Sequence, residues 1–230
     1  NAPGVTDKEI KIGNTMPYSG PASGYSAQGR VQSAYYDMIN AKGGVNGRKI
    51  VFLSYDDGYS PPKTVEQTRK LVEQDDVLAT FGQLGTPTNS AIQKYMNSKK
   101  TPHLFISTGA DKWNDPKNYP FTVPLYPSYT MEAKVAARYI LQSKPDAKIG
   151  VLFQNDDFGK DYLKGLKEGL GDKAEKLIVK EIPYEVGSPT LDSQMIALKQ
   201  SGADVFFCIT VPKFGAQAIK RAAEIEWKPL

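Results

Sequence analysis

The chain has 230 residues, of which 40% are apolar and 23% charged, with a formal net charge of +4. This composition is typical of a globular protein of one or two domains and excludes an intrinsically disordered chain. The single cysteine excludes an intrachain disulfide framework and a cysteine zinc cluster. The basic residues are spread along the chain, which argues against a nucleic-acid partner. No apolar run approaches the roughly 18 residues that a membrane-spanning helix needs.

The first half of the chain alternates predicted strands with predicted helices. Strands are predicted over residues 8–15, 49–55, 77–81 and 103–107. A first helix is predicted from apolar residues on one face at i, i+3, i+4, i+7 and i+8, namely Val31, Ala34, Tyr35, Met38 and Ile39. A second helix opens at Pro61-Pro62, where proline suits the first turn, and a third covers residues 90–97. Residues 1–6 are predicted to be non-structural.

A segment rich in proline and aromatic residues, 109–128, separates the two halves. Its four prolines prevent it from forming one regular element, so it is interpreted as a crossing between domains. Beyond it, helices are predicted over residues 129–141, 159–170, 191–200 and 214–225, and strands over 148–153, 177–182 and 204–209. This alternation predicts an α/β fold with mainly parallel sheets.

Several common catalytic motifs are missing from the sequence. There is no GxxxxGK[ST] loop, no GxGxxG after the first strand and no GxSxG elbow. The single histidine, His103, begins an apolar strand and is interpreted as a packed, hydrogen-bonded core residue. Cys208 lies in the apolar run VFFCI and is interpreted as a buried, inert thiol.

Two acidic pairs, Asp56-Asp57 and Asp156-Asp157, each follow a predicted strand. They could serve as metal ligands or as an acid/base pair. The favoured interpretation makes them turn residues and helix caps, because aspartate accepts hydrogen bonds from the free N–H groups of a helix start. No metal site, catalytic residue or cofactor is therefore predicted.

Ligands of open parallel sheets bind beyond the carboxyl ends of the strands. Four loops leave such ends: 16–24 with Tyr25, 82–89, 108–113 and 154–158. The loop 82–89 is small and polar and enters a helix. Its glycines would let a ligand approach the backbone, and Thr86, Thr88 and the exposed helix N–H groups suit an anion such as a carboxylate, although a simple helix cap and tight turn explain the loop equally well. Gln83, Gly85 and Thr86 are its candidate ligand-binding residues. Tyr25 and Phe158 are predicted either to cover an apolar ligand or to be packing residues.

Six segments carry a resemblance to a known family. They are YSGPASGYSAQG (18–29), DMINAKGGVNGRKI (37–50), YDDGYSPPKTVEQTRKLV (55–72), FGQLGTPTNSA (81–91), STGADKWNDPKNYPFT (107–122) and QNDDFGKDYLKGLKEGL (154–170). With these motifs the chain resembles the branched-chain-amino-acid-type (leucine/isoleucine/valine-binding) periplasmic solute-binding proteins of bacterial ABC importers. The resemblance covers essentially all 230 residues.

The resemblance implies a type I periplasmic binding protein: two Rossmann-like α/β lobes with mainly parallel sheets, joined by a hinge and closing on a ligand. It implies a first lobe over residues 7–121, a second, incomplete lobe over 122–230, and a truncated C-terminus, because members of the family are longer. The residue that binds a ligand ammonium group is expected beyond Leu230.

By motif position, the resemblance implies that the ligand carboxylate meets Thr86 and the stretch Gly109, Ala110 and Asp111, with Tyr25 and Phe158 near the ligand. Thr108, directly before this stretch, is a further candidate. Phe158 stands where the family often has tyrosine, and Asp111 where threonine or serine is usual. These departures keep two ligand classes open, an aliphatic amino acid and an aromatic acid.

The resemblance also implies partners and a location. We expect a non-enzymatic, monomeric receptor, periplasmic or lipid-anchored outside the cytoplasm, that binds a small carboxylate-bearing molecule and docks to a membrane permease. The alternative is a ligand-sensing domain of a regulator on the same plan. An α/β enzyme using either acidic pair is the third hypothesis.

Overall fold

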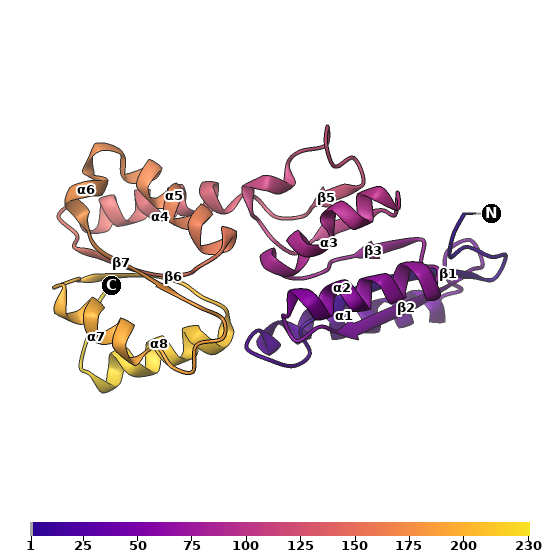
Figure 1. Cartoon of the computed structure of the whole chain (residues 1–230), viewed down its shortest axis with the longest axis horizontal. Helices are drawn as coiled ribbons and strands as arrows, with labels where there is room; N and C mark the ends of the chain where they lie inside the picture. The colour runs from indigo at the N-terminus through magenta and orange to yellow at the C-terminus, as the bar shows by residue number, and fades with distance from the viewer. Residues whose placement is uncertain (1) are drawn as a thin grey trace. The chain divides into compact units, whose positions relative to one another are not determined.

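The computed structural model describes residues 2–230, and the chain divides into two compact units, Asn1–Tyr126 and Pro127–Leu230. Strands and helices alternate through both units (Figure 1). Every named strand pair is parallel, so the predicted α/β class with parallel sheets is confirmed. Among the described residues no helix is long and apolar enough to cross a membrane.

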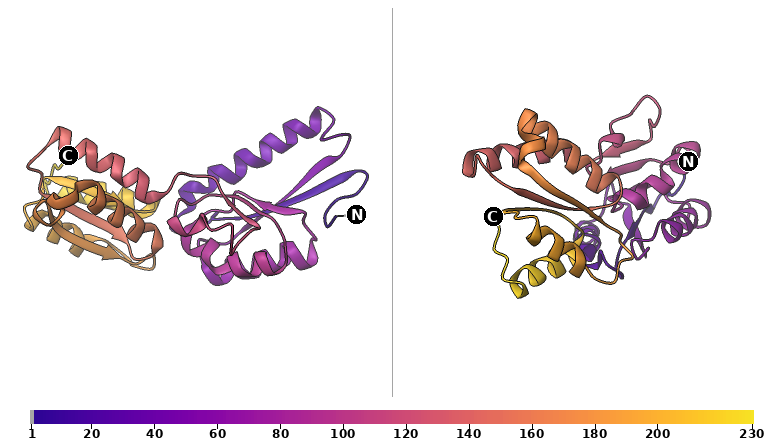
Figure 2. Two further views of the ribbon diagram at one scale, coloured as in Figure 1. Left: turned by 90° about the horizontal axis from the view of Figure 1, so that it is seen from above. Right: turned by 60° about the vertical axis from the view of Figure 1, so that its left-hand side comes forward.

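The first unit is built on a five-stranded sheet of order β2-β1-β3-β4-β5. Helix α1 covers one face of this sheet, while α2 and α3 lie on the other (Figure 2). The bounds are β1 Glu9–Met16, α1 Ser26–Ala41, β2 Lys49–Asp56, α2 Pro61–Arg69, β3 Ala79–Phe81, α3 Thr86–Ser98, β4 His103–Ile106 and β5 Thr122–Pro124. Helix α2 continues into a π-helical turn, Lys70–Gln74, and two short 3₁₀ turns cover Ser23–Tyr25 and Asp111–Trp113.

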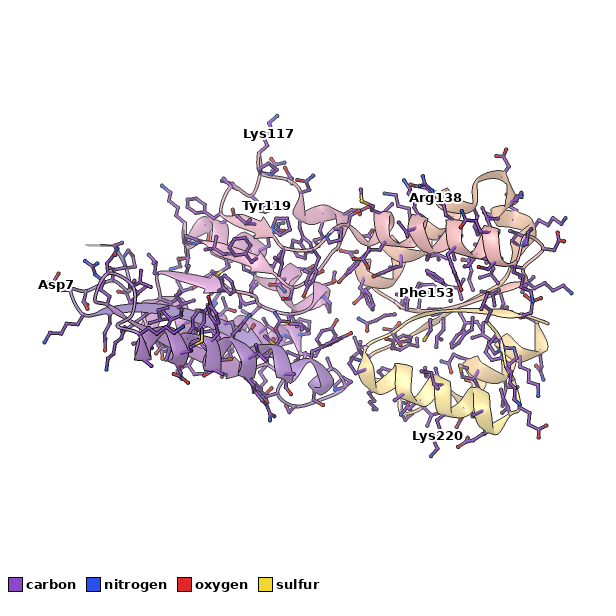
Figure 3. All side chains as sticks on the ribbon, turned by 180° about the vertical axis from the view of Figure 1, so that it is seen from behind. Asp7, Lys117, Tyr119, Arg138, Phe153 and Lys220 are labelled. Atoms are coloured by element: carbon purple, nitrogen blue, oxygen red, sulfur yellow. The ribbon has the colours of Figure 1, made fainter. Side chains whose placement is uncertain are left out.

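The second unit has a three-stranded sheet of order β7-β6-β8 between two helical layers. Helices α4 and α5 lie on one side and α7 and α8 on the other (Figure 1), and Arg138 of α4 and Lys220 of α8 mark these layers in Figure 3. The bounds are α4 Tyr129–Ser143, β6 Ile149–Gln154, α5 Asp157–Leu170, α6 Ala174–Leu177, β7 Ile178–Tyr184, α7 Asp192–Gln200, β8 Val205–Ile209 and α8 Pro212–Glu224. Gly171–Lys173 forms a 3₁₀ turn between α5 and α6.

The crossing segment, residues 109–128, contains a strand that was not predicted because of its prolines. Thr122–Pro124 forms β5, which pairs with β4 at the edge of the first sheet, where proline is tolerated. The boundary predicted between residues 121 and 122 lies immediately before this strand, whereas the contacts divide the chain after Tyr126.

Residues 2–6 are ordered by hydrogen bonds, so the prediction that they are non-structural is wrong. The Thr6 N–H donates to Glu9 O at 2.9 Å, and the Lys11 N–H donates to Gly4 O at 2.8 Å. Val5 forms an antiparallel bridge with Ile10. Residue 1 of the predicted segment lies outside the described residues.

The predicted first helix is present as α1, but its apolar face does not pack against the sheet. Val31 and Tyr35 of α1 are 67% and 55% exposed, and Met38 is exposed as well. The inward face carries hydrogen-bonding side chains: the Gln28 Nε2 group donates to Gly82 O at 3.1 Å, and Gln32 accepts from the Asn14 amide at 2.8 Å. The ring of Tyr36 also packs edge-on against Phe52 and Phe81, so hydrogen bonds and aromatic contacts together hold α1 to the sheet.

Cys208 is exposed, which corrects the prediction of a buried thiol. It lies on β8, an end strand of the described sheet order. Its side chain alternates with those of Val205 and Ile209, which are buried in the core beside α4 and α5. An apolar sequence run does not fix the burial of every residue in an end strand.

His103 is fully buried, as predicted, and hydrogen-bonded in the core of the first unit. Asn89 donates its amide to Gln83 O and Gly85 O, so its Oδ1 atom accepts from His103 Nε2, 2.7 Å away. His103 Nδ1 has no hydrogen-bond partner within residues 2–230. The imidazole is therefore neutral, and burial lowers its pKa to about 3.

This buried histidine predicts an acid-sensitive stability. The unfolded chain takes up a proton as the pH falls through about 6.5, whereas folded His103 resists protonation down to pH about 3, so its stabilising contribution is lost as the pH falls through this window. We expect this residue alone to lower the free energy of unfolding by about 2 kcal/mol between pH 7 and pH 5. Urea unfolding at several pH values measures it.

The matched control for that prediction is His103→Gln, because the chain has a single histidine. Burial raises the pKa of Asp57 and of Asp156, which acts in the opposite direction, but both carboxyl groups are present in both proteins. The difference between the two pH profiles therefore isolates His103. Identical slopes would contradict the burial of a neutral imidazole.

Candidate functional site

The carboxyl ends of β1 to β4 lie at one edge of the first sheet, because these strands are parallel neighbours. The connections that leave this edge contain most of the residues predicted to bind a ligand. They run from β1 to α1, from β2 to α2, from β3 to α3 and from β4 to β5. Ligands of open parallel sheets bind at such an edge, so its geometry is described first.

Asp56 holds two of these connections together. Its Oδ1 atom accepts from the Tyr18, Ser19 and Gly58 N–H groups at 3.0, 3.1 and 2.9 Å, and its Oδ2 atom accepts from Ser19 Oγ at 2.6 Å. Burial opposes ionisation, but the hydrogen bonds from Ser19 and Gly58, together with Lys63, outweigh it and lower the pKa of Asp56. The carboxylate thus organises the loops rather than facing a ligand.

Asp57 and Asp156 have similar structural partners. Asp57 is fully buried and accepts from the Tyr59 N–H and from Thr64 Oγ1, both at 2.9 Å. Asp156 caps α5 by accepting from the Gly159 N–H at 3.3 Å. The interpretation of the acidic pairs as turn and cap residues is confirmed for these carboxylates. Within residues 2–230 no group of three His, Cys, Asp or Glu side chains is placed to hold a metal ion.

Thr86 is the first residue of α3 and lies at the sheet edge. The helix begins four residues before the predicted start at residue 90, because Pro87 fits the first turn. Thr86 Oγ1 lies 2.6 Å from Thr108 Oγ1, and the Trp113 indole N–H donates to Thr108 Oγ1 at 3.1 Å. Both threonines are buried, and the N–H groups of a first helical turn favour an anion.

Two predicted ligand residues have structural partners in the interior. The Gln83 side chain is buried and donates to Thr15 Oγ1 at 3.0 Å and to Thr68 Oγ1 at 3.3 Å. Gly85 has a φ of +106°, and a Cβ atom there would lie 2.5 Å from the Tyr59 ring. The conformation of Gly85 therefore sets where α3 begins.

Three more predicted residues follow Thr108 in the connection after β4. Gly109 and Ala110 are buried, and the Ala110 N–H lies 3.4 Å from Thr108 Oγ1. Asp111 is half-buried and starts the 3₁₀ turn that carries Trp113. The structure therefore brings Thr86, Thr108 and Ala110 together. Tyr25, 39% exposed, ends the 3₁₀ turn after β1 at the same sheet edge.

Phe158 lies in the first turn of α5 in the second unit. Its ring makes edge-on contacts with Tyr129 and Tyr162, with ring centres 5.2 and 5.6 Å apart, and it packs beside the core that contains Phe153 (Figure 3). These contacts give Phe158 a packing role in its own unit. Its predicted role as a ligand-covering ring stays a prediction.

The sheet edge of the second unit is held together by Tyr184. Its hydroxyl donates to Gln154 Oε1 at 3.0 Å and accepts from the Val211 N–H at 3.1 Å. The carboxyl ends of β6, β7 and β8 are thereby joined through a single buried side chain.

Trp113 and Gln28 were missed as residues of the first edge. Gln28 donates to Gly82 O and to Ser107 Oγ, and so joins α1 to the connections after β3 and β4. Both residues lie in segments that the sequence singles out, the loop 108–113 and the motif 18–29, but neither segment specifies which side chains form hydrogen bonds.

Comparison with known proteins gives consistent matches over nearly the whole chain. The sequence model of the periplasmic binding protein family matches residues 9–229. The Leu/Ile/Val-binding protein homolog 7 of Brucella abortus (strain 2308) is 25% identical over 232 aligned residues, which cover 96% of this chain and 57% of the relative.

Two solved structures illustrate the likeness in fold. A fatty acid ABC transporter substrate-binding protein from Thermomonospora curvata has a TM-score of 0.85 and 26% identity, covering 99% of this chain and 58% of its own. A solute-binding protein from Rhodopseudomonas palustris BisB5, in complex with 3,4-dihydroxybenzoic acid, has a TM-score of 0.79 and 21% identity, covering 95% and 59%. The chain thus spans less than two thirds of the length of each.

Proposed function

The chain belongs to the periplasmic binding protein family, and from this premise we propose that it captures a small carboxylate-bearing ligand as part of an extracytoplasmic solute receptor of an ABC transporter. The receptor would lie in the periplasm or be lipid-anchored outside the cytoplasm, and would deliver its ligand as a monomer to a membrane permease. The Thermomonospora curvata relative, described as an ABC transporter substrate-binding protein, supports this role.

One observation carries the proposed ligand class. Thr86, at the start of α3, has its hydroxyl 2.6 Å from that of Thr108, beside the first-turn N–H groups of the helix. Hydroxyl and helix N–H donors suit a carboxylate. Gly109, Ala110 and Asp111 follow Thr108 and are proposed to add backbone contacts.

Binding rather than catalysis is proposed because the candidate reactive groups have structural partners. Asp57 and Asp156 accept hydrogen bonds in turns and caps. His103 is fully buried. No cofactor is required for such a receptor.

The ligand is proposed to be a branched-chain or other aliphatic amino acid, or an aromatic acid. The Brucella relative is named as a Leu/Ile/Val-binding protein homolog, and the Thermomonospora relative as a fatty acid ABC transporter substrate-binding protein. The Rhodopseudomonas structure shares the fold and holds 3,4-dihydroxybenzoic acid. Tyr25 and Phe158 are proposed as the aromatic side chains that meet the non-carboxylate part of the ligand.

The test is a Thr86→Val substitution. L-leucine, octanoate and 3,4-dihydroxybenzoate are titrated into the chain, and binding is followed by calorimetry and by the rise in melting temperature. We expect at least one acid to bind, and Thr86→Val to weaken it by about tenfold to hundredfold, since a hydrogen bond to a charged group is worth about 1.5–3 kcal/mol.

Thr86→Ser keeps the hydroxyl and is expected to retain most of the affinity. Ser98→Ala, which removes an exposed hydroxyl at the other end of α3, serves as the control and should leave binding unchanged. A wild-type chain that binds none of the three acids would contradict the proposed function. Binding that survives Thr86→Val unaltered would remove Thr86 from the site.

A further inference from the structure

The hydroxyl groups behind the proposed carboxylate site form a chain that begins at an indole. Trp113 Nε1 lies 3.1 Å from Thr108 Oγ1, and Thr108 Oγ1 lies 2.6 Å from Thr86 Oγ1. An indole N–H can donate a hydrogen bond but has no atom that accepts one. Thr108 Oγ1 therefore accepts a hydrogen bond from Trp113, so the direction of the first hydrogen bond in this series is fixed.

The direction of the next hydrogen bond follows from the partners of Thr108. Its oxygen is close to the Trp113 indole N–H, the Ala110 backbone N–H at 3.4 Å and the Thr86 hydroxyl. The first two are donors, so within the described residues Thr86 is the acceptor available for the Thr108 proton. Because Thr108 is only 1% exposed, leaving that proton unbonded is unfavourable. Thr108 therefore donates to Thr86.

Thr86 then has its own hydroxyl proton left to donate at the sheet edge. It stands at the first position of α3, where Pro87 has no N–H and the Asn89 N–H donates to Gly85 O, so the Thr88 N–H is the first-turn donor beside it. At Thr86 and the start of α3 the site thus presents donors. A carboxylate meets these donors with two acceptor oxygens, whereas a carboxamide offers them one oxygen and an NH₂ group that only donates.

We propose that Trp113 is a positioning residue which, through Thr108, holds Thr86 as a hydrogen-bond donor and so makes the site selective for a carboxylate over the matching carboxamide. This inference rests on the proposed function, because it concerns the same ligand group. Trp113 acts through Thr108 and Thr86 and need not touch the ligand.

The experiment compares acid and amide pairs on the full 230-residue chain. The probes are L-leucine with L-leucinamide, octanoate with octanamide, and 3,4-dihydroxybenzoate with 3,4-dihydroxybenzamide, each titrated by calorimetry. Trp113→Phe keeps an aromatic ring and removes the N–H, which frees Thr108 and Thr86 to reverse their bond. The ratio of acid to amide affinity is expected to fall by about threefold to tenfold, the value of one net hydrogen bond.

Three further variants separate positioning from a merely structural role. Thr108→Val removes the middle hydroxyl of the hydrogen-bond series Trp113–Thr108–Thr86 and should lower the ratio of acid to amide affinity by a similar factor. The double variant should show no further fall in the ratio of acid to amide affinity, because both changes interrupt the same series of hydrogen bonds. Trp227→Phe is the matched control, since its indole donates to Ala203 O in the second unit, and it should leave the ratio unchanged.

Nitrogen-15 NMR of the wild-type chain supplies a measurement that does not depend on a variant folding. The chain has two tryptophans and so two indole N–H signals. Saturation with the acid should move the Trp113 signal, because hydrogen bonds in a chain strengthen one another, while the Trp227 signal should stay in place.

The outcomes distinguish this inference from the function on which it rests. If the wild-type chain binds none of the acids, the proposed function fails and the inference fails with it. If it binds an acid but the variants keep the wild-type ratio, the function stands and the role of Trp113 is overturned. If the variants do not fold, a Trp113 indole N–H signal that does not move when the acid binds overturns the role of Trp113.

Discussion

Gly165→Val is expected to lower the free energy of unfolding of the second unit by about 3 kcal/mol or more. A Cβ atom at Gly165 would lie 2.3 Å from Thr130 O and 2.6 Å from Thr130 Cα. Both are backbone atoms of α4 and cannot move aside as a side-chain end would. One turn further along α5, a Cβ at Gly169 would lie 2.6 Å from Ala137 Cβ. The two helices thus pack with glycine at their contact, and a branched side chain would force them apart.

Urea unfolding followed by Trp227 fluorescence measures this effect. Each unit contains one tryptophan, Trp113 in the first and Trp227 in the second, so a Trp113→Phe background reports the second unit alone. Gly187→Val is the control, because a Cβ there would have no neighbour within 4 Å. An unfolding midpoint that Gly165→Val leaves in place would mean that α4 and α5 do not pack this closely.

Gly85→Val is expected to destabilise the first unit by about 3 kcal/mol and to abolish ligand binding. Its φ of +106° and ψ of 143° lie in a region that is essentially restricted to glycine. In addition, a Cβ would lie 2.5 Å from both Thr88 Oγ1 and the Tyr59 ring. Relief of this strain would displace the start of α3, and with it Thr86.

Gly43→Val separates the two causes of that effect. Gly43 has a φ of +100° but no atom within 4 Å of its Cβ position, so its substitution carries the backbone strain without the collision. Trp113 fluorescence in a Trp227→Phe background reports the first unit. We expect Gly43→Val to cost less than Gly85→Val and to leave ligand binding intact. If Gly85→Val and Gly43→Val lower the free energy of unfolding equally and both retain ligand binding, Gly85 is not tightly packed.

Most of the elements were predictable from the sequence because their signals are local. The pattern of residues 148–153 and 204–209 predicted strands close to β6, Ile149–Gln154, and β8, Val205–Ile209. Hydrophobic periodicity and proline at helix starts depend on neighbouring residues alone. The fold class follows from the order of these elements.

The burial of individual side chains was less predictable, since it depends on which elements lie opposite. The apolar residues Val31 and Tyr35 suggested an inward face for α1, yet Gln28 and Gln32 turn inward because carbonyl and amide groups of distant strands meet them. Cys208 lies in an apolar run but is exposed in an end strand.

The candidate site was predictable at the level of loops but not of hydrogen bonds. The rule that ligands meet the carboxyl ends of parallel strands selected the loop with Thr86. Gln83, in the same loop, points to Thr15 and Thr68 instead. The hydrogen bond between Trp113 and Thr108 depends on the 3₁₀ turn Asp111–Trp113. No periodic pattern in the sequence predicts this turn.

The continuity of each sheet in the chain has a consequence for synthesis. The described strands of the first sheet all lie between Glu9 and Pro124, and those of the second between Ile149 and Ile209. A ribosome therefore delivers every described strand of the first sheet before it begins the second. Domains generally fold as units in the order in which they emerge, so the described strands of the first sheet can pair before those of the second are made. Such a layout limits wrong pairing between halves during translation.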